Sequence, residues 1–315
     1  MIPNLTDTIC AVATAPGVGA IAVIRVSGPE TMQIMEQVFR PHSRKSFSAL
    51  KMRYAHFGVI RSRETVIDEV LCTLFRAPES YTGEDSAEIS CHGSALIQQQ
   101  IMAVLIGNGA RIAMGGEFTL RAFRNGKFDL AQAEAVADLI AADSDAARDL
   151  ALSQMRGGYS SRIKGLREKL VNFAALIELE LDFSEEDVEF ADRSQLSNLL
   201  DELKDEIISL SSSFSKGNVM KSGIPVTIIG KPNAGKSTLL NAILNEERAI
   251  VSDIPGTTRD VIEDTINING FSFRFIDTAG LRDSHDTIES IGIERTVEKI
   301  RQAQVILHIL DISET

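Results

Sequence analysis

The sequence predicts a multidomain protein that combines α+β and α/β segments, and three observations lead to this fold class. A chain of 315 residues is long enough for about two domains of ordinary size. The first part reads as mixed α and β, and the pattern changes to helix from Asp129. A strand, a glycine loop and a helix then follow one another from Val226. We therefore expect three successive units, over residues 1–119, 120–218 and 219–315.

The first unit is predicted to be mixed α and β. An apolar strand at Ala20–Val26 follows a glycine loop. A helix is expected to start after this strand, because Ser27 or Gly28 can cap it and Pro29 suits a first turn. Further strands are expected at Tyr54–Ile60 and Val66–Phe75, a short strand within the loop-like stretch Ala77–Gly93, and a helix at Ser94–Ile106.

The second unit is predicted to be a helix bundle. After an alanine-rich stretch, apolar residues recur every three or four positions, as they do on one face of a helix. Such stripes usually form core seams, so we expect these side chains to be buried. The acidic stretch Ser184–Asp192 is expected to be a solvated loop, and the serine-rich stretch Ser209–Asn218 a linker into the last unit. The stripe residues are Ile163, Leu166, Leu170, Phe173, Ile177 and Leu181, followed by Leu196, Leu199, Leu203 and Ile207.

The last unit is predicted to be an α/β segment of the P-loop, Ras-like type. An apolar strand precedes a glycine loop that starts at Gly230, and the residues after the loop read as a helix. Two alternating strands around Asn269–Gly270 predict a β-hairpin, since this dipeptide tolerates the left-handed backbone of a tight turn. A buried strand is expected at Gln304–Leu310.

Composition excludes several classes of function. The net charge of −12 disfavours non-specific nucleic-acid binding, because proteins that grip a phosphate backbone are usually basic. No apolar run is long enough to span a membrane, and the N-terminus does not read as a signal peptide. The cysteines Cys10, Cys72 and Cys91 are odd in number and widely spaced, which suits a reducing compartment. We therefore expect a cytoplasmic protein without a structural zinc site.

The strongest motif is the phosphate-binding loop. The residues from Gly230 to Ser237 fit the pattern G-x-x-x-x-G-K-[ST]. In this pattern the backbone N–H groups close around the phosphates at a helix N-terminus, whose dipole favours anions. Lys236 is expected to reach the β- and γ-phosphates, and the Ser237 hydroxyl to bind Mg²⁺.

Two further motifs lie at the spacing expected of a GTPase. The loop "GTTRD" offers Thr257 or Thr258 as a second Mg²⁺ ligand. The stretch "DTAG" ends a strand with Asp277, placed for the metal, and with Gly280, whose N–H can meet the γ-phosphate. Together the three motifs resemble those of translation-factor-like small GTPases, so GTP is the expected nucleotide. The nucleotide-binding set is Asn233, Ala234, Gly235, Lys236, Ser237, Thr238, Ser252, Thr257, Thr258, Asp277, Thr278, Ala279 and Gly280.

The group that orients the attacking water is not fixed by these motifs. Leu281 stands where Ras-like proteins carry a glutamine, and an apolar side chain cannot orient water. Three acidic residues follow in the next segment, and spacing alone does not choose among them: Asp283, Asp286 and Glu289. A cation bound beside Asn233 could supply positive charge to the bridge between the β- and γ-phosphates.

Three motifs outside the nucleotide loops are more specific. The stretches "DTICAVATAPGVGAIAVIRVSG", "YTGEDSAEISCHG" and "GEFTLRAFRNGKFDLAQAEAVADLI" resemble the MnmE (TrmE) family of tRNA-modification GTPases. The resemblance implies a folate-binding N-terminal domain that dimerises, a helical domain and a G domain inserted into it. It also implies a partner, the FAD-dependent protein MnmG, with which the family modifies carbon 5 of the tRNA wobble uridine using a tetrahydrofolate one-carbon unit.

The same resemblance assigns individual residues. Arg25, Glu88 and Lys127 fall where the family contacts the folate derivative, which is 5-formyl- or 5,10-methylene-tetrahydrofolate. Glu289 matches the glutamate that positions the attacking water. The MnmG partner can bring much of the tRNA-binding surface, which fits the acidic charge. The Mg²⁺ ligands are then Ser237 and Thr258, and the K⁺ ligands Asn233, Ser252, Ile254 and Thr257.

One departure from the family and two rival functions remain. The guanine-reading motif N-K-x-D does not occur, so we expect a truncated G domain that binds GTP weakly, in a chain that keeps its folate site. A ribosome-assembly GTPase that binds RNA is the main rival, but it would need a basic RNA-binding module. A plain P-loop ATPase or kinase is disfavoured by "GTTRD" and by Leu281.

Overall fold

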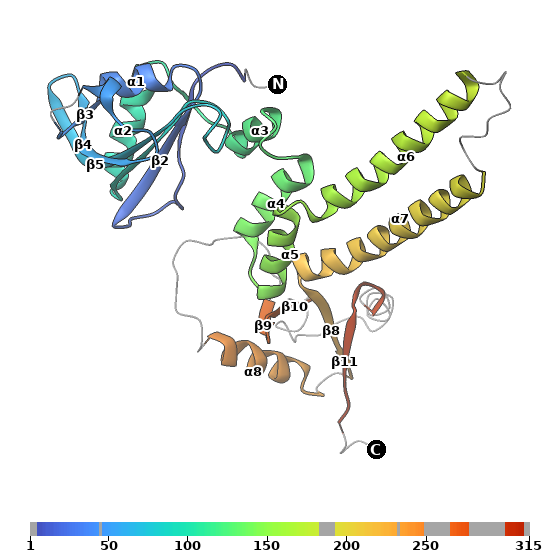
Figure 1. The fold of residues 1–315 in the computed structure, drawn as a ribbon. Helices are drawn as coiled ribbons and strands as arrows, with labels where there is room; N and C mark the ends of the chain where they lie inside the picture. The colour runs from blue at the N-terminus through green and yellow to red at the C-terminus, as the bar shows by residue number, and fades with distance from the viewer. Residues whose placement is uncertain are drawn as a thin grey trace. The chain divides into compact units, whose positions relative to one another are not determined.

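The computed structural model describes residues 5–43, 46–182, 193–231, 234–248, 265–276 and 300–311. The chain divides into two compact units, Met1–Ala133 and Glu134–Thr315, whose elements Figure 1 labels. The finer division into three units at residues 119 and 218 stays a prediction. Within the described ranges, no helix has the length and apolar character needed to cross a membrane.

The first unit is built on a seven-stranded sheet with the strand order β3-β4-β5-β6-β2-β1-β7. Neighbouring strands are antiparallel except β1 and β7, which are parallel. The strands are β1 (Ile9–Val12), β2 (Ile21–Ser27), β3 (Phe39–Pro41), β4 (Ala55–Ser62), β5 (Thr65–Phe75), β6 (Ser86–His92) and β7 (Arg111–Ile112). The helices are α1 (Thr31–Val38), the short 3-10 helix η1 (Phe47–Ala49), α2 (Ala95–Gly107) and α3 (Glu117–Arg124).

The two faces of this sheet differ in character. Along β2, Ala22, Ile24 and Val26 are buried and pack with side chains of α1 and α2 in one apolar core. Because successive side chains of a strand point to opposite faces, Arg25 lies on the other face, which is only partly covered. Glu88 is its direct partner on β6. The alternation of β2 therefore places a charged pair on the face opposite the core.

The second unit joins helices to a four-stranded sheet. The strand order is β11-β8-β10-β9, in which β8 pairs in parallel with β10 and β11, and β9 is antiparallel to β10. Side chains of α8 complete the small apolar core of this sheet. The helices are α4 (Leu130–Ala141), α5 (Asp145–Met155), α6 (Gly158–Asp182), α7 (Arg193–Ser222) and α8 (Lys236–Arg248). The strands are β8 (Ile224–Gly230), β9 (Thr265–Ile268), β10 (Phe271–Phe275) and β11 (Val305–Ile309).

The helical part confirms the predicted helices but corrects two details. The stripe on the long helices α6 and α7 is not a buried seam: Phe173 is 8% exposed, but Ile163 is 57%, Ile177 40% and Ile207 59% exposed. Two long helices side by side cover only one strip of each other, which leaves much of the remaining apolar surface uncovered. The acidic stretch at 184–192 lies outside the described residues.

The serine-rich stretch predicted as a linker is helix, which is the second correction. The helix α7 runs through it and ends only at Ser222, next to strand β8. The hydroxyl groups of Ser212 and Ser213 donate to the carbonyls of Ser209 and Leu210, at 2.9 and 2.8 Å. Serine hydroxyls that bond to the preceding turn are compatible with a helix, although serine also favours turns. Composition alone therefore pointed to the wrong local structure.

Strands of the second unit agree closely with the sequence prediction. The hairpin turn is at Asn269 and Gly270, whose φ angles of 52° and 81° are the left-handed values that an Asn-Gly turn supplies. Strand β11 lies where a strand was expected, but its side chains are half-buried or exposed rather than buried. It is the last strand at one side of the described sheet, which accounts for this exposure.

Candidate functional site

The phosphate-binding loop begins where β8 ends. Gly230 has a φ of 155°, and a Cβ there would lie 2.5 Å from the carbonyl oxygen of Ile309, so only glycine fits between these strands. Gly235 has a φ of 92°, and its Cβ position faces open space. The helix α8 starts at the next residue, and the N–H groups of a first helical turn point out of the N-terminal end. The local geometry is therefore that of an anion cradle at a helix N-terminus.

Lys236 is the charged group of this cradle. Its ammonium donates to the carbonyl oxygens of Gly230 and Lys231, at 2.8 and 2.6 Å, so the side chain curls back over the loop. Burial lowers its pKa from the ordinary value, because desolvation disfavours the charged form. A phosphate would offer this ammonium a stronger, charged acceptor than the two carbonyls.

Only part of the predicted nucleotide site can be placed. Ala234, Gly235, Lys236, Ser237 and Thr238 form the end of the loop and the first turn of α8. The other predicted residues lie outside the described part of the chain, and these are Asn233, Ser252, Ile254, Thr257, Thr258, Asp277, Thr278, Ala279, Gly280 and Glu289.

A second candidate site lies on the first unit, around Arg25 and Glu88. The Nε and Nη2 atoms of Arg25 donate to one carboxylate oxygen of Glu88, at 3.0 and 2.7 Å. The two side chains are 24% and 34% exposed, so a ligand can reach the pair. The antiparallel register of β2 and β6 sets the two residues directly opposite each other. Two residues predicted to bind the same ligand are therefore in contact.

Aromatic side chains complete the surroundings of Arg25. Its Cζ atom lies 4.8 Å from the ring centroid of Tyr81 and 5.6 Å from that of Phe118. The Tyr81 hydroxyl is 2.9 Å from that of Thr119, and the Tyr81 ring meets Phe128 edge-on at 5.6 Å between centroids. Sequence reasoning missed these residues, although each stands within one of the three quoted motifs. The available signal was Phe128, which directly follows Lys127, whereas Tyr81 and Phe118 are adjacent to no predicted residue in the sequence.

The third predicted residue, Lys127, is held by the loop before β6. Its ammonium donates to the carbonyl oxygen of Pro78 at 3.0 Å, and the neighbouring Asn125 donates to that of Thr82 at 2.8 Å. Gly83 in this loop has a φ of 78°, and a Cβ there would lie 3.1 Å from Asn125. Since Tyr81 belongs to the same loop, the loop ties Lys127 to the surroundings of Arg25.

A buried ionic network fixes the base of this loop. Arg121 is fully buried and donates to the backbone and carboxylate of Asp7, at 2.6 and 2.7 Å, and to Glu117 at 3.1 Å. It also lies 3.3 Å from the carboxylate of Glu84, a residue of the loop. Arg111 adds a second cation to Asp7 and Glu117. The loop and α3 are thus joined by charges that are compensated within the protein.

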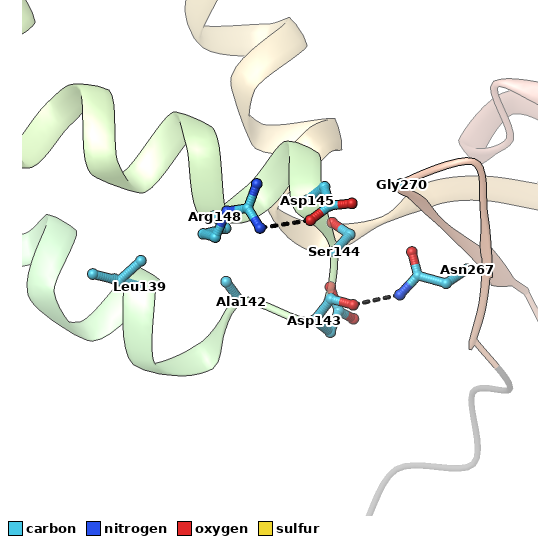
Figure 2. Close-up of a pocket in the computed structure, with 8 residues that line it drawn as sticks. All are labelled: Leu139, Ala142, Asp143, Ser144, Asp145, Arg148, Asn267 and Gly270. Atoms are coloured by element: carbon cyan, nitrogen blue, oxygen red, sulfur yellow. Dashed lines mark hydrogen bonds and ion pairs between the residues drawn. The ribbon is translucent and has the colours of Figure 1, made fainter. Parts of the chain in front are cut away.

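The second unit holds an open cavity of about 570 Å³ where the hairpin turn meets the junction of α4 and α5 (Figure 2). The Asn267 amide donates to the carbonyl oxygen of Asp143, and the backbone N–H of Ala146 donates to that of Gly270 at 3.0 Å. Two charged residues that line the cavity, Arg148 and Asp145, form an ion pair at 2.7 Å. No predicted site residue lines it, so it is not assigned as a candidate site. The lining residues are Leu139, Ala142, Asp143, Ser144, Asp145, Arg148, Asn267 and Gly270.

The cysteines do not form a reactive or metal-binding centre. Burial raises the pKa of Cys10 to about 11 and that of Cys72 to about 12, and it also raises the pKa of Cys91. All three are free thiols inside the first unit. Within the ranges that the structure describes, no three potential ligands gather into a metal site.

Two family models match this chain, and several relatives that share one name are similar to it over nearly its whole length. A family model described as "GTP-binding protein TrmE N-terminus" matches residues 8–127, and one described as "MnmE helical domain" matches residues 130–311. A relative from Bacteroides fragilis, named tRNA modification GTPase MnmE, is 63% identical over 98% of this chain. Relatives of the same name from Christiangramia forsetii and Cytophaga hutchinsonii are 57% and 56% identical over 99% and 100% of the chain. The chain spans 66% of the first two relatives' lengths and 68% of the third.

Proposed function

This chain belongs to the MnmE family, and from that premise we propose that it works as a GTP-hydrolysing, folate-binding component of tRNA wobble-uridine modification. The observation that carries the proposal is the identity of 56–63% to proteins named tRNA modification GTPase MnmE, over nearly the whole chain. The modification would be made at carbon 5 of the uridine, as a carboxymethylaminomethyl or aminomethyl group. A tetrahydrofolate derivative would supply the one-carbon unit.

The cradle at the start of α8 supports the GTPase part of the proposal. Its glycines, the N–H groups at the start of α8 and the Lys236 ammonium suit a triphosphate. Bound Mg²⁺ and K⁺ would supply positive charge to the phosphates. Ser237, in the first turn of α8, is the Mg²⁺ ligand that we propose within the described chain. The remaining proposed groups are Thr258 for Mg²⁺, Asn233, Ser252, Ile254 and Thr257 for K⁺, and Glu289 for the attacking water.

The surroundings of Arg25 support the folate part. Glu88 occupies the Nε and Nη2 edge of the guanidinium, and among the described residues no acceptor contacts Nη1. A guanidinium with an open edge can bind a carboxylate, of which folate carries two on its glutamate tail. The adjacent rings suit a flat heteroaromatic group. These features fit a folate, with Lys127 as a further cation.

We propose three partners on the same basis. They are the FAD-dependent protein MnmG, tRNA bound largely through that protein, and a second copy of this chain that associates through the N-terminal unit. The RNA-binding ribosome-assembly alternative is less well supported, because the family matches cover both units.

Folate binding is the first expected result. Adding 5-formyltetrahydrofolate should raise the melting temperature, because a ligand that binds only the folded state stabilises it. Arg25→Ala should weaken binding about 10- to 100-fold, since it removes a charge-assisted hydrogen bond. Calorimetric titration measures the affinity of the wild type and of Arg25→Ala for this folate. The matched control is Arg40→Ala, because the exposed Arg40 side chain bonds only to nearby carbonyls at the far edge of the sheet. Equal affinity of the wild type and Arg25→Ala would refute the assignment.

Potassium dependence is the second expected result. GTP hydrolysis should be faster in K⁺ than in Na⁺, and Asn233→Ala should lower the K⁺ rate by on the order of 10²-fold, because one stabiliser of developing charge is lost. Phosphate release measures the rate of hydrolysis in K⁺ and in Na⁺ for the wild type and for Asn233→Ala. The Bacteroides fragilis relative serves as a reference enzyme. Equal rates in K⁺ and Na⁺ for both proteins would remove the K⁺ role proposed for Asn233.

A further inference from the structure

We propose that Tyr81 is a positioning residue of the folate site, which holds the Arg25 guanidinium in the orientation that receives the ligand. The inference rests on the proposed function, because it concerns the same site. Tyr81 has no role in the motif-based assignment, which named only charged residues. Its contacts with Arg25, Phe128 and Thr119 make it the aromatic residue that joins three elements of the site.

Glu88 and the Tyr81 ring together restrict the freedom of the Arg25 side chain. An arginine side chain at a protein surface has several rotatable bonds and loses their freedom when it binds a ligand. Here Glu88 fixes one edge of the guanidinium, and the Tyr81 ring lies 4.8 Å from its Cζ atom. A cation beside an aromatic face is attracted by the ring quadrupole. The guanidinium is therefore oriented before the ligand arrives, and its Nη1 edge remains for the ligand.

Tyr81 is itself held in place by its own contacts and by those of its loop. Its hydroxyl is hydrogen-bonded to Thr119 on α3, and its ring edge packs on Phe128, next to Lys127. Its loop is anchored by Asn125 and by the buried Arg121–Glu84 pair. A fixed ring can restrain the guanidinium beside it. Tyr81 thus couples the position of Arg25 to the segment that carries Lys127, so both cations are arranged together.

Substitutions of Tyr81 should change the affinity for the ligand according to whether they keep the aromatic ring. Tyr81→Leu keeps an apolar side chain but removes the ring, so the affinity for 5-formyltetrahydrofolate should fall about 3- to 30-fold, the range that a cation–π contact supplies. Tyr81→Phe keeps the ring and loses only the hydroxyl contact with Thr119, so it should bind within about 3-fold of the wild type. The matched control is Tyr54→Leu, because Tyr54 is 60% exposed and its ring lies near Lys51 instead.

A spectroscopic readout separates positioning from a general structural role. The chain has no tryptophan and only three tyrosines, Tyr54, Tyr81 and Tyr159. A reduced folate bound at Arg25 should quench the emission of the adjacent Tyr81 most strongly. Tyr81→Phe should therefore lose most of the ligand-induced quenching while still binding the ligand. Tyr54→Phe and Tyr159→Phe should retain the ligand-induced quenching.

The experiment is calorimetric titration of each variant with 5-formyltetrahydrofolate, together with tyrosine emission and a melting curve. Weak binding by Tyr81→Leu, recovery in Tyr81→Phe and loss of quenching in Tyr81→Phe are the expected results. Wild-type affinity in Tyr81→Leu, or unchanged quenching in Tyr81→Phe, would overturn the role of Tyr81 and leave the folate site standing. If the wild type binds no folate, the proposed folate function fails as well. If Tyr81→Leu does not fold, the quenching and affinity of Tyr81→Phe still decide the question.

Discussion

Replacing Arg121 with methionine is expected to lower the free energy of unfolding of the first unit by about 3–5 kcal/mol. The side chain is fully buried and compensates the carboxylates of Asp7, Glu84 and Glu117. Methionine fills similar space but leaves buried negative charge with only Arg111 nearby. Urea unfolding followed by circular dichroism and tyrosine emission measures the change.

The control for this prediction is Arg53→Met. Arg53 also forms an ion pair, with Glu79 at 3.0 Å, but both side chains are more than 60% exposed. Exposed ion pairs contribute little to stability, so the free energy of unfolding should change by less than about 1 kcal/mol. Equal destabilisation by the two substitutions would contradict the role assigned to the buried network.

Acid titration gives a second readout of the same network. The hydrogen bond from Arg111 lowers the pKa of Asp7 most, against an opposing effect of burial, and Arg121 lowers it further. For Glu117, burial acts to raise the pKa, but hydrogen bonds from Arg111, the Met114 N–H and Arg121 outweigh it, and the pKa is lowered. Both groups therefore contribute stability above their ordinary pKa values of 3.8 and 4.5, and this is lost as the pH falls through their lower folded-state values. Glu117→Gln should make the loss of stability below about pH 4 less steep.

Replacing Lys236 with alanine is expected to lower the rate of GTP hydrolysis about 10²- to 10³-fold. The ammonium lies over the loop, where it donates to the carbonyl oxygens of Gly230 and Lys231. Without it, the charge that develops on the phosphates in the transition state loses a stabilising partner. Phosphate release from GTP measures the effect.

Two controls separate the loss of the Lys236 ammonium from the general effect of removing a lysine and from a loss of folding. Lys169→Ala removes an exposed lysine whose partner is Glu202 on the neighbouring helix, and it should leave hydrolysis unchanged. Circular dichroism of Lys236→Ala should match the wild type, because the ammonium contacts that the substitution removes are to loop carbonyls. Wild-type hydrolysis by a folded Lys236→Ala would rule out the phosphate-binding role.

Local sequence chemistry was enough to predict most of the elements. The Asn269–Gly270 turn follows from backbone preferences of two adjacent residues. The break between α4 and α5 was not predicted, although the Ser144 hydroxyl accepts the Ala147 N–H at 3.2 Å in an ordinary N-cap. The continuation of α7 through its serines could not be predicted from composition, because serine serves both helices and turns.

The candidate folate site shows a second limit of prediction from the sequence. The residue types of Arg25, Glu88 and Lys127 were assigned by resemblance, but their arrangement depends on the register of β2 and β6 and on a loop that returns to α3. Such contacts join segments far apart in the chain, and periodicity does not specify them. Tyr81 and Phe118 meet at Arg25 for this reason, and a reading of isolated motifs could not bring them together.

The three buried thiols have a practical consequence. A cysteine reacts with alkylating reagents through its thiolate, and Cys10, Cys72 and Cys91 are both inaccessible and hard to ionise. A single cysteine introduced at an exposed position, such as Val18 at 91% exposure, would react far faster than any native one. Fluorophores or spin labels could then be attached at chosen points without first removing the natural cysteines, and the folded protein would remain intact during labelling.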